Sequence, residues 1–273
     1  MTAALSSHAL RFGADVYFHS LRTFGLAALK RRLQDAGLVL CYHNVVEGEE
    51  AEVGDLGLHV PRDRFERHMR WLVERYRVVP LRDFVDRLVS GCSMRSIAAV
   101  TFDDGYAGVF EHAVPILAAL GIPATVFLVA DAAGTRTRFW WDGTASHQPA
   151  DWRTVRAALG RGIELGAHSV THPSLPTLTD AQLEDEIVGS RVIIHGATGV
   201  RPDFFAYPFG HWDARVRAVV EAAGYRAGFT LDYGLNSAAA DPWALRRVNV
   251  PAGISEMRLE TWAAGFHRLR RAG

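Results

Sequence analysis

Two adjacent carboxylates follow an apolar segment in the motif TFDDG at 101–105. A helix N-cap would explain one of them, because aspartate is a good cap residue. A cap uses a single acid, however, and the second carboxylate would be repelled by its neighbour. The pair Asp103 and Asp104 therefore favours a chemical site in which the two acids have different roles.

Two histidines lie four residues apart in HSVTH at 168–172. This spacing lets both imidazoles face the same way on a helical turn, which Pro173 would keep short. On its own, an HxxxH pair is as often two ordinary surface or core histidines. One aspartate with two histidines, by contrast, makes a three-ligand set with open positions for water and substrate, the usual form of a catalytic zinc-type site.

Together, TFDDG, HSVTH and the later motif FAYPFG at 205–210 resemble the polysaccharide deacetylase family over about residues 37–254. The resemblance implies that Asp104, His168 and His172 bind a divalent metal ion and that Asp103 is the general base. Zinc is the first candidate, while cobalt, nickel and manganese stay open, because this donor set accepts each of them. The ion would activate a water and polarise an acetamide carbonyl, and Asp103 would take the proton of that water.

The leaving amine also needs a proton donor, and here the sequence departs from the best-known family pattern. That pattern has a late histidine as the acid and an arginine shortly before the Pro-Phe pair, whereas Ala206 stands at the arginine's position. The form FAYPFG and the early motif YHNV at 42–45 instead resemble an exopolysaccharide-modifying branch, which implies His43 as the acid. A structural histidine bonded to a loop carbonyl is the alternative for His43.

Two further residues are expected to support the reaction. The family pattern around PFG implies that the backbone N–H of Phe209 stabilises the oxyanion. Strand alternation places Arg247 on the face opposite Val248, and an arginine there could hold Asp103 ionised and aimed. Arg246 would then point to the other face, although a β-bulge would exchange the two arginines.

Aromatic side chains near these motifs are candidate substrate contacts. Trp140 and Trp141, in the turn-rich segment 131–150, could form a sugar-stacking wall, because pyranose rings present apolar faces to indole. Buried core tryptophans are the alternative. Tyr207 and Trp212, within and after FAYPFG, are further candidates at the rim.

The elements that must position these residues are short strands alternating with helices. From about residue 37, β-rich apolar runs alternate with segments of helical period, which predicts repeated βα units and a parallel sheet. Strands are expected at 38–42, 77–79, 98–102, 124–129, 163–167, 204–207, 226–230 and 246–250, with helices at 61–76, 107–120 and 179–196. With the resemblance, this predicts an α/β fold, a distorted (β/α) barrel of seven or eight strands. His43, Asp103, His168 and Phe209 then follow strand ends, where functional residues of such sheets collect.

The remaining segments are expected to be loops and an extension. The segments 45–57 and 131–150 are expected to be rim loops, and residues 1–36 a helical extension before a catalytic domain at 37–273. Apolar residues at helical spacing in the extension end in three cations at 30–32. A membrane surface could bind such a helix, but packing on the domain, with the cations at the helix C-terminus, is the favoured interpretation. Cys41 and Cys92 are expected to be buried free thiols.

Composition limits the possible partners. Thirty basic and thirty acidic residues cancel, which argues against a nucleic-acid partner. No secretory signal or transmembrane segment is visible, so a cytoplasmic protein is expected. The sequence leaves the oligomeric state open.

The predicted function is removal of the N-acetyl group from an amino sugar in a glycan, a glycoside or a lipid-linked precursor. A carbohydrate O-acetyl esterase and a non-catalytic sugar-binding relative are the alternatives, and the retained Asp103 argues against the second.

Overall fold

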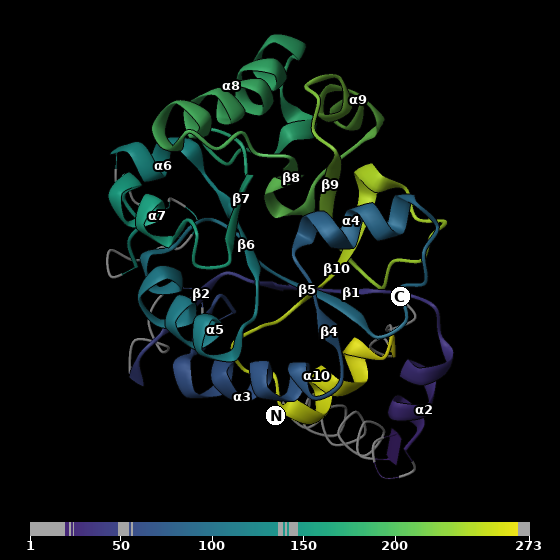
Figure 1. Cartoon of the computed structure of the whole chain (residues 1–273). Helices are drawn as coiled ribbons and strands as arrows, with labels where there is room; N and C mark the ends of the chain where they lie inside the picture. The colour runs from purple at the N-terminus through teal and green to yellow at the C-terminus, as the bar shows by residue number, and fades with distance from the viewer. Residues whose placement is uncertain are drawn as a thin grey trace, which may run out of the picture.

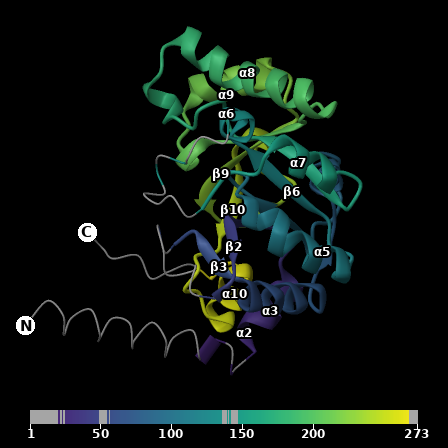
Figure 2. The same cartoon turned by 90° about the vertical axis from the view of Figure 1, so that its left-hand side faces the viewer.

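The computed structural model describes residues 20–266, apart from positions 22, 24, 49–54, 56, 136–138, 140 and 142–146. Trp140 and most of the expected N-terminal extension lie outside the described residues. The described part of that extension includes helix α2 (Leu26–Leu33), which lies beside α10 (Glu256–Ala263) in Figure 2. Lys30 Nζ donates to the Gly265 carbonyl at 2.7 Å, and Ala27 is buried. The helix is therefore attached to the end of the described chain.

Seven parallel strands of the described chain close into a barrel, with helices outside the ring (Figure 1). Around the ring, β1 pairs with β10, which is followed by β9, β8, β7, β6 and β5, and β5 pairs with β1 again. Their bounds are β1 (Leu38–Tyr42), β5 (Ile97–Phe102), β6 (Ala124–Leu128), β7 (Ile163–Ala167), β8 (Phe204–Ala206), β9 (Ala227–Tyr233) and β10 (Leu245–Asn249). The expected (β/α) barrel is confirmed.

The remaining expected strand, β4 (Arg77–Val78), lies outside the closed ring. It pairs with the first two residues of β5, whereas β6 pairs with the last three residues along that strand. The other edge of β5 is occupied by β1 over its full length. β4 therefore extends the sheet at the amino end of the barrel without entering the ring.

Two expected loops contain regular structure. Asn44–Val46 forms β2, which pairs in parallel with β3 (His59–Pro61), so the expected rim loop at 45–57 begins later than predicted. Val45 and Val46 are buried and β-branched, which suits a strand, but three residues are too short to show alternation. Ala130–Thr135 forms helix α6, which begins directly after β6. The expected rim loop at 131–150 is correspondingly shorter.

The helices follow their sequence signals, with one exception. α3 (Arg62–Val73) begins after Pro61, and α8 (Asp180–Thr198) begins with the predicted capping box of Thr179 and Gln182. The helix expected over 107–120 is divided into a π-helical turn, η2 (Val109–Ala113), and α5 (Val114–Leu120). Pro115 explains the division, because proline lacks the N–H that would continue the α-helical pattern. The other helices are α4 (Leu81–Val89), α7 (Trp152–Ala158) and α9 (Ala214–Ala222).

The inside of the barrel changes from apolar to polar along the strands. Near the amino ends, Val39, Ala99 and Leu245 pack with Phe84 of α4, which covers this end of the barrel in Figure 1. Because side chains alternate along a strand, the residues two positions further on face the same interior. On β1, β5 and β10 these are Cys41, Thr101 and Arg247. The polar side chains thus gather at the carboxyl end, where the loops carry His43, Asp103 and Asp104.

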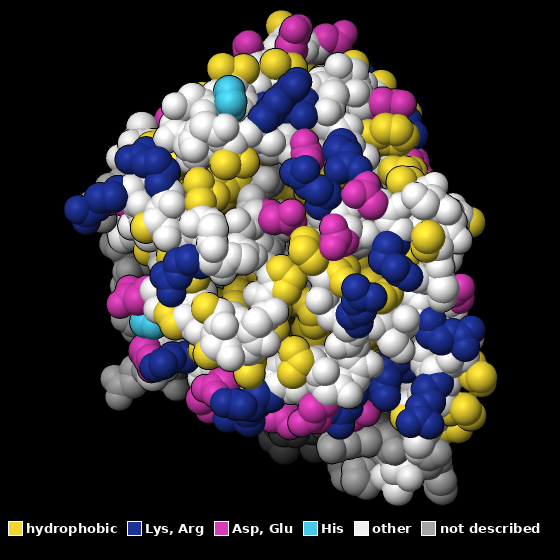
Figure 3. All heavy atoms as spheres, in the orientation of Figure 1, with side chains coloured by type: hydrophobic (Ala, Val, Ile, Leu, Met, Phe, Trp, Pro, Cys, Tyr) yellow, Lys and Arg dark blue, Asp and Glu magenta, His cyan; other side chains and the backbone are white. Residues whose placement is uncertain are grey.

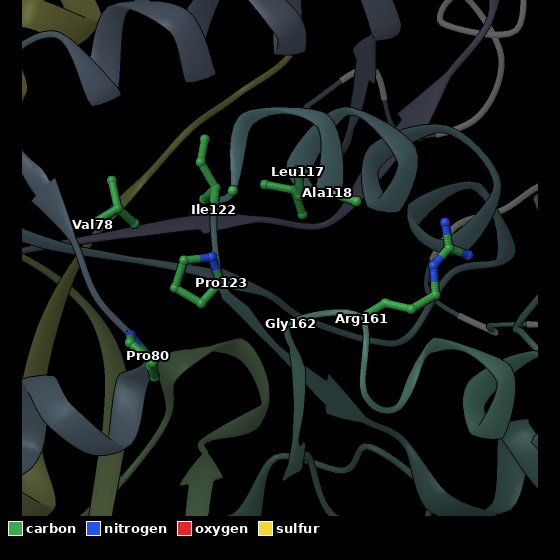
Figure 4. Close-up of a pocket in the computed structure, with 9 residues that line it drawn as sticks. Val78, Pro80, Leu117, Ala118, Ile122, Pro123, Arg161 and Gly162 are labelled. Carbon is green, nitrogen blue, oxygen red and sulfur yellow. The ribbon is translucent and has the colours of Figure 1, made fainter.

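A surface pocket lies at the opposite, amino end of the barrel. It has a volume of about 660 Å³ and is lined mainly by apolar residues, with Pro123 before β6 and Gly162 before β7 (Figure 4). Figure 3 shows this face of the molecule, on which hydrophobic side chains gather near the centre among scattered charges. Functional residues of (β/α) barrels lie at the carboxyl ends of the strands. The pocket is therefore remote from the candidate site.

Candidate metal and catalytic site

Asp104, His168 and His172 bring three donor atoms close together. Asp104 Oδ1 lies 3.5 Å from Nε2 of His168 and 3.5 Å from Nε2 of His172. The two Nε2 atoms are 3.2 Å apart. In a tetrahedral site with bonds of about 2.0–2.2 Å, neighbouring ligand atoms are about 3.4 Å apart. The three buried side chains therefore fit one face of such a site, with a fourth position for water or substrate.

The histidines converge through a loop and not through a helix. The helical turn expected over HSVTH is wrong: the segment after β7 is irregular. Ser169 and His172 have left-handed backbone conformations, with φ of 64° and 62°, and the Ser169 hydroxyl oxygen accepts from the His172 amide at 2.9 Å. Glu186 on α8 accepts from two further loop amides. Turn geometry thus directs both imidazoles toward Asp104.

The protonation state of the histidines suits metal binding. His168 Nδ1–H donates to the Ala206 carbonyl at 2.8 Å, which leaves Nε2 with its lone pair toward Asp104. Burial lowers the pKa of His168 and that of His172 below the usual value. Both rings are therefore neutral near neutral pH, as metal ligands must be.

Asp103 lies beside this cluster and is held by a buried arginine. Arg247 Nη1 and Nη2 donate to its two carboxylate oxygens at 2.7 and 2.6 Å, a bidentate pair in which neither side chain is more than 1% exposed. Arg247 Nε also donates to the Thr230 carbonyl at 2.9 Å. Burial, the largest single effect, would raise the pKa of Asp103, but Arg247 together with His168 and His43 outweighs it and keeps that pKa well below its usual range. Asp103 is therefore an ionised carboxylate that cannot rotate freely.

Arg247, and not Arg246, faces the barrel interior. The register of β10 against β9 shifts between Leu245 and Arg247. Arg246 is nevertheless exposed and Arg247 fully buried, as simple alternation predicts.

A second group of possible ligands consists of Cys41, His43 and Asp103. The guanidinium of Arg247 occupies the Asp103 carboxylate, so a cation bound there would face a buried positive charge. Burial also raises the pKa of the Cys41 thiol well above its usual value, which opposes the thiolate that a metal needs. The trio of Asp104 and the two histidines is the better metal site.

His43 follows β1 at the same end of the barrel, with a nitrogen within 4.8 Å of an Asp103 carboxylate oxygen. It is 8% exposed, and burial lowers its pKa to about 4, although Asp103 opposes this shift. His43 is thus neutral at neutral pH. It can act as an acid only after it receives a proton.

The other expected site residues differ in position. Phe209 has a strained φ of 58°, and its ring lies 4.5 Å from that of His172, so its backbone is near the cluster. Tyr207 has no exposed surface, and its hydroxyl donates to the Trp243 carbonyl, so it packs the fold and cannot contact a substrate. Trp212 is half-buried and stacks on Tyr207. Trp141 stacks on His172.

Two contacts in the site have no counterpart in the sequence-based expectations. The Cys41 thiol donates to Asp103 Oδ2 at 3.4 Å, and the Trp141 indole N–H donates to Asp104 Oδ2 at 3.3 Å. Alternation on β1 could have indicated the first, because Cys41 shares a face with His43. Cys92 is exposed, so the expectation that both thiols are buried is wrong for this residue. It follows the turn after α4.

Comparison with known proteins places this geometry in a family. The polysaccharide deacetylase family model matches residues 90–228, which include TFDDG, HSVTH and FAYPFG. YxkH of Bacillus subtilis, which carries a provisional polysaccharide deacetylase name, is 26% identical over 219 residues, or 80% of this chain and 72% of that protein. A chitooligosaccharide deacetylase of Bradyrhizobium is 28% identical over 130 residues, which span 47% of this chain and 52% of that one.

A solved structure has the same fold. The deacetylase PplD of Streptococcus pyogenes, in complex with acetate, aligns with a TM-score of 0.71 and 21% identity, covering 83% of this chain and 98% of that one. In the described part of this chain, no helix is both long enough and apolar enough to cross a bilayer. With the matched motifs assembled at one end of the barrel, the chain belongs to the polysaccharide deacetylase family.

Proposed function

We propose that the protein is a metal-dependent hydrolase that removes the N-acetyl group of an N-acetylated amino sugar. The observation that carries the proposal is the pairing of two distinct carboxylates at one barrel end. The donor atoms of Asp104 and of two neutral histidines are separated by the distances expected for three ligands of a tetrahedral metal site. Asp103 is kept ionised beside them by Arg247. A sugar-binding protein would need no ionised base beside a metal site.

Asp104, His168 and His172 would hold the divalent ion, with zinc as the first candidate. When bound, such an ion supplies an activated water at neutral pH and a Lewis acid for the acetyl carbonyl. The chain's own residues supply the rest. Phe209, whose backbone lies near His172, is the proposed backbone donor to the oxygen that becomes negative during attack.

Asp103 and His43 are the proposed proton-transfer residues. Asp103 takes the proton of the attacking water, and Arg247 keeps the carboxylate aimed while it does so. His43 lies within 4.8 Å of Asp103 and is neutral, so the proton it delivers to the leaving amine is one gained during the reaction. The proton lost by water thus ends on the amine, and the second product is acetate.

The substrate class is proposed from the relatives and from the chemistry of the site. A relative named as a chitooligosaccharide deacetylase supports an N-acetylated sugar as substrate. Trp212, half-buried beside FAYPFG, is a proposed sugar contact, since an indole can stack on a pyranose face. We propose a glycan, a glycoside or a lipid-linked precursor as the carrier of that sugar.

One observation favours an O-acetyl esterase as the second candidate. Burial lowers the pKa of His43 to about 4, so only a small fraction of this histidine is protonated at neutral pH. The leaving group of an ester is an alkoxide. Its departure depends less on a strong general acid than the departure of an amine from an amide does. Replacing His43 by alanine tests whether the amide and ester reactions depend on this residue to different extents. Loss of activity on N-acetyl substrates but not on O-acetyl substrates is expected if the amide reaction needs His43.

Acetate release from N-acetylated sugars, oligomers and glycolipid precursors tests the proposal directly. The assay is run with the protein as isolated, after chelation, and after return of each divalent metal. We expect activity that is lost on chelation and restored by metal, with amides hydrolysed better than matched O-acetyl sugars. Full activity in metal-free protein, or no acetate from any acetylated sugar with metal restored, would overturn the proposal.

A further inference from the structure

Trp141 contacts two of the three proposed metal ligands. Its indole ring stacks on the His172 imidazole, with ring centroids 3.8 Å apart and planes 24° apart. Its indole N–H donates to Asp104 Oδ2 at 3.3 Å, the carboxylate oxygen that does not face the histidines. A single side chain thus restrains a carboxylate on one strand end and an imidazole two strands away in the barrel.

The three ligands differ in how they are otherwise oriented. His168 is fixed by its hydrogen bond to the Ala206 carbonyl. Within the described part of the chain, the buried Nδ1 of His172 has no hydrogen-bond partner, so packing must set the orientation of this ring. Metal-binding histidines usually depend on such outer contacts to fix the ring. Among the described residues, Trp141 makes the closest ring contact with His172.

Trp141 belongs to a row of rings that crosses the mouth of the barrel, here called the aromatic row. Its successive centroid distances are 4.4, 4.8, 3.8 and 4.5 Å, through Tyr106, Phe139, Trp141, His172 and Phe209. Phe139 is buried. Through Phe139 and Trp141, the row therefore links residues after β5 to residues after β7 and β8.

Residues 148–150, which precede α7, bond to the backbone beside Asp104. The Ala150 amide donates to the Gly105 carbonyl at 3.0 Å, and the Ala107 amide donates to the Gln148 carbonyl at 2.8 Å. These two bonds hold residues 148–150 beside the TFDDG turn that carries Asp104.

We propose that Trp141 is a positioning residue for the metal site, which orients Asp104 and His172 and raises metal affinity. This inference rests on the proposed function, because it takes those residues as ligands. It also replaces the sequence-based interpretation of Trp141 as a sugar-stacking wall. The ring contacts His172 and Phe139, and its indole N–H donates a hydrogen bond to Asp104.

The test compares the wild-type protein with Trp141→Phe and Trp141→Ala. Phenylalanine keeps a ring over His172 and removes the hydrogen bond to Asp104, whereas alanine removes both. Trp243→Phe is the matched control: its indole N–H also bonds a protein oxygen, but that oxygen is the Tyr225 carbonyl. Zinc affinity is measured by competition with a chromophoric chelator, and unfolding of the metal-free proteins checks that each variant folds.

We expect Trp141→Phe to weaken zinc binding by about 10-fold and Trp141→Ala by up to about 100-fold, the usual range for outer contacts of metal ligands. Trp243→Phe should bind zinc as the wild type does. At saturating zinc, Trp141→Phe should regain most of its kcat with little change in KM. The change in tryptophan fluorescence when zinc binds should be lost in Trp141→Phe and kept in Trp243→Phe.

Three outcomes separate this inference from the proposed function. Wild-type affinity in both Trp141 variants, with a raised KM, would overturn the inference and restore the sugar-stacking role. If Trp141→Ala does not fold without metal, the result for Trp141→Phe decides alone. A wild-type protein that binds no zinc, or binds it equally well after Asp104→Ala, would instead overturn the proposed function.

Discussion

At the residue scale, adjacent carboxylates have opposite partners. Asp103 faces an arginine in the barrel interior, and Asp104 faces two neutral imidazoles. Asp104 reaches this position with a left-handed φ of 70°, which aspartate tolerates better than most residues. The turn directs the two side chains to different surroundings.

The separate roles of the two acids predict separate losses. Asp104→Ala should remove most of the bound metal and, with it, the activity. Asp103→Asn should retain metal but lose about 100- to 10,000-fold in kcat, the usual contribution of a general base. Metal analysis of the purified variants beside acetate release gives both quantities. Equal metal loss in the two variants would show that the carboxylates act as one ligand set.

Arg247 predicts an effect on stability as well as on catalysis. Arg247→Met leaves the Asp103 carboxylate buried without its partner, which should lower the free energy of unfolding by about 3–5 kcal/mol. Arg246→Met, an exposed neighbour on the other face, should change it by no more than about 0.5 kcal/mol. Urea unfolding measures both. Adding Asp103→Asn to Arg247→Met should recover part of the loss, and no recovery would mean that packing, not charge, is the cause.

At the element scale, the site depends on turns that follow the strands. Gly105 has φ of 83°, and a Cβ there would lie 2.6 Å from the Leu128 side chain. Gly199, at the end of α8, has φ of 74° and open space around it. The two glycines share a left-handed backbone and differ in crowding, so they separate conformational strain from steric clash.

Replacing each of these glycines by alanine should therefore have different effects. Gly199→Ala should cost about 1 kcal/mol, from backbone strain alone. Gly105→Ala adds overpacking of about 1–3 kcal/mol and should also weaken metal binding, because Asp104 precedes it. Thermal unfolding and chelator competition on both variants test this. Unchanged metal affinity in Gly105→Ala would show that Leu128 yields without moving the TFDDG turn.

The strands and the site differ in how far sequence could predict them. Strands such as LVLCY and AAVTF are buried apolar runs bounded by polar turns, so their positions could be read directly. Position at a strand end then placed His43, Asp103 and His168 together. The loop that carries His172 was not predictable, because its shape depends on the left-handed Ser169 and on contacts with α8. The contacts of Trp141 were not predictable either, because they join three loops that are far apart in the sequence and share no hydrophobic pattern.

At the scale of the whole molecule, polar groups are concentrated at the carboxyl end of the barrel, while α4 covers the amino end. Besides the site itself, the described core contains His68 on α3, whose Nδ1 lies 3.3 Å from the Tyr42 hydroxyl on the outer side of β1. Burial lowers the pKa of His68 to about 4, with smaller contributions from Arg64 and Arg67. The stability that α3 gains by packing on the barrel should therefore depend on pH through His68.

Because its folded pKa lies below the ordinary value of about 6.5, His68 binds protons more readily in the unfolded chain. Its contribution should therefore make the folded state lose about 2 kcal/mol of stability between pH 7.5 and 5, and lose no more below its folded pKa. His68→Gln keeps an acceptor for Tyr42 but cannot titrate, so its stability should fall less over this interval. Urea unfolding of both proteins at a series of pH values isolates the difference, in which other buried histidines such as His43 cancel. Parallel curves for the two proteins would mean that His68 keeps its proton on folding, and that α3 does not pack on the barrel through a neutral imidazole.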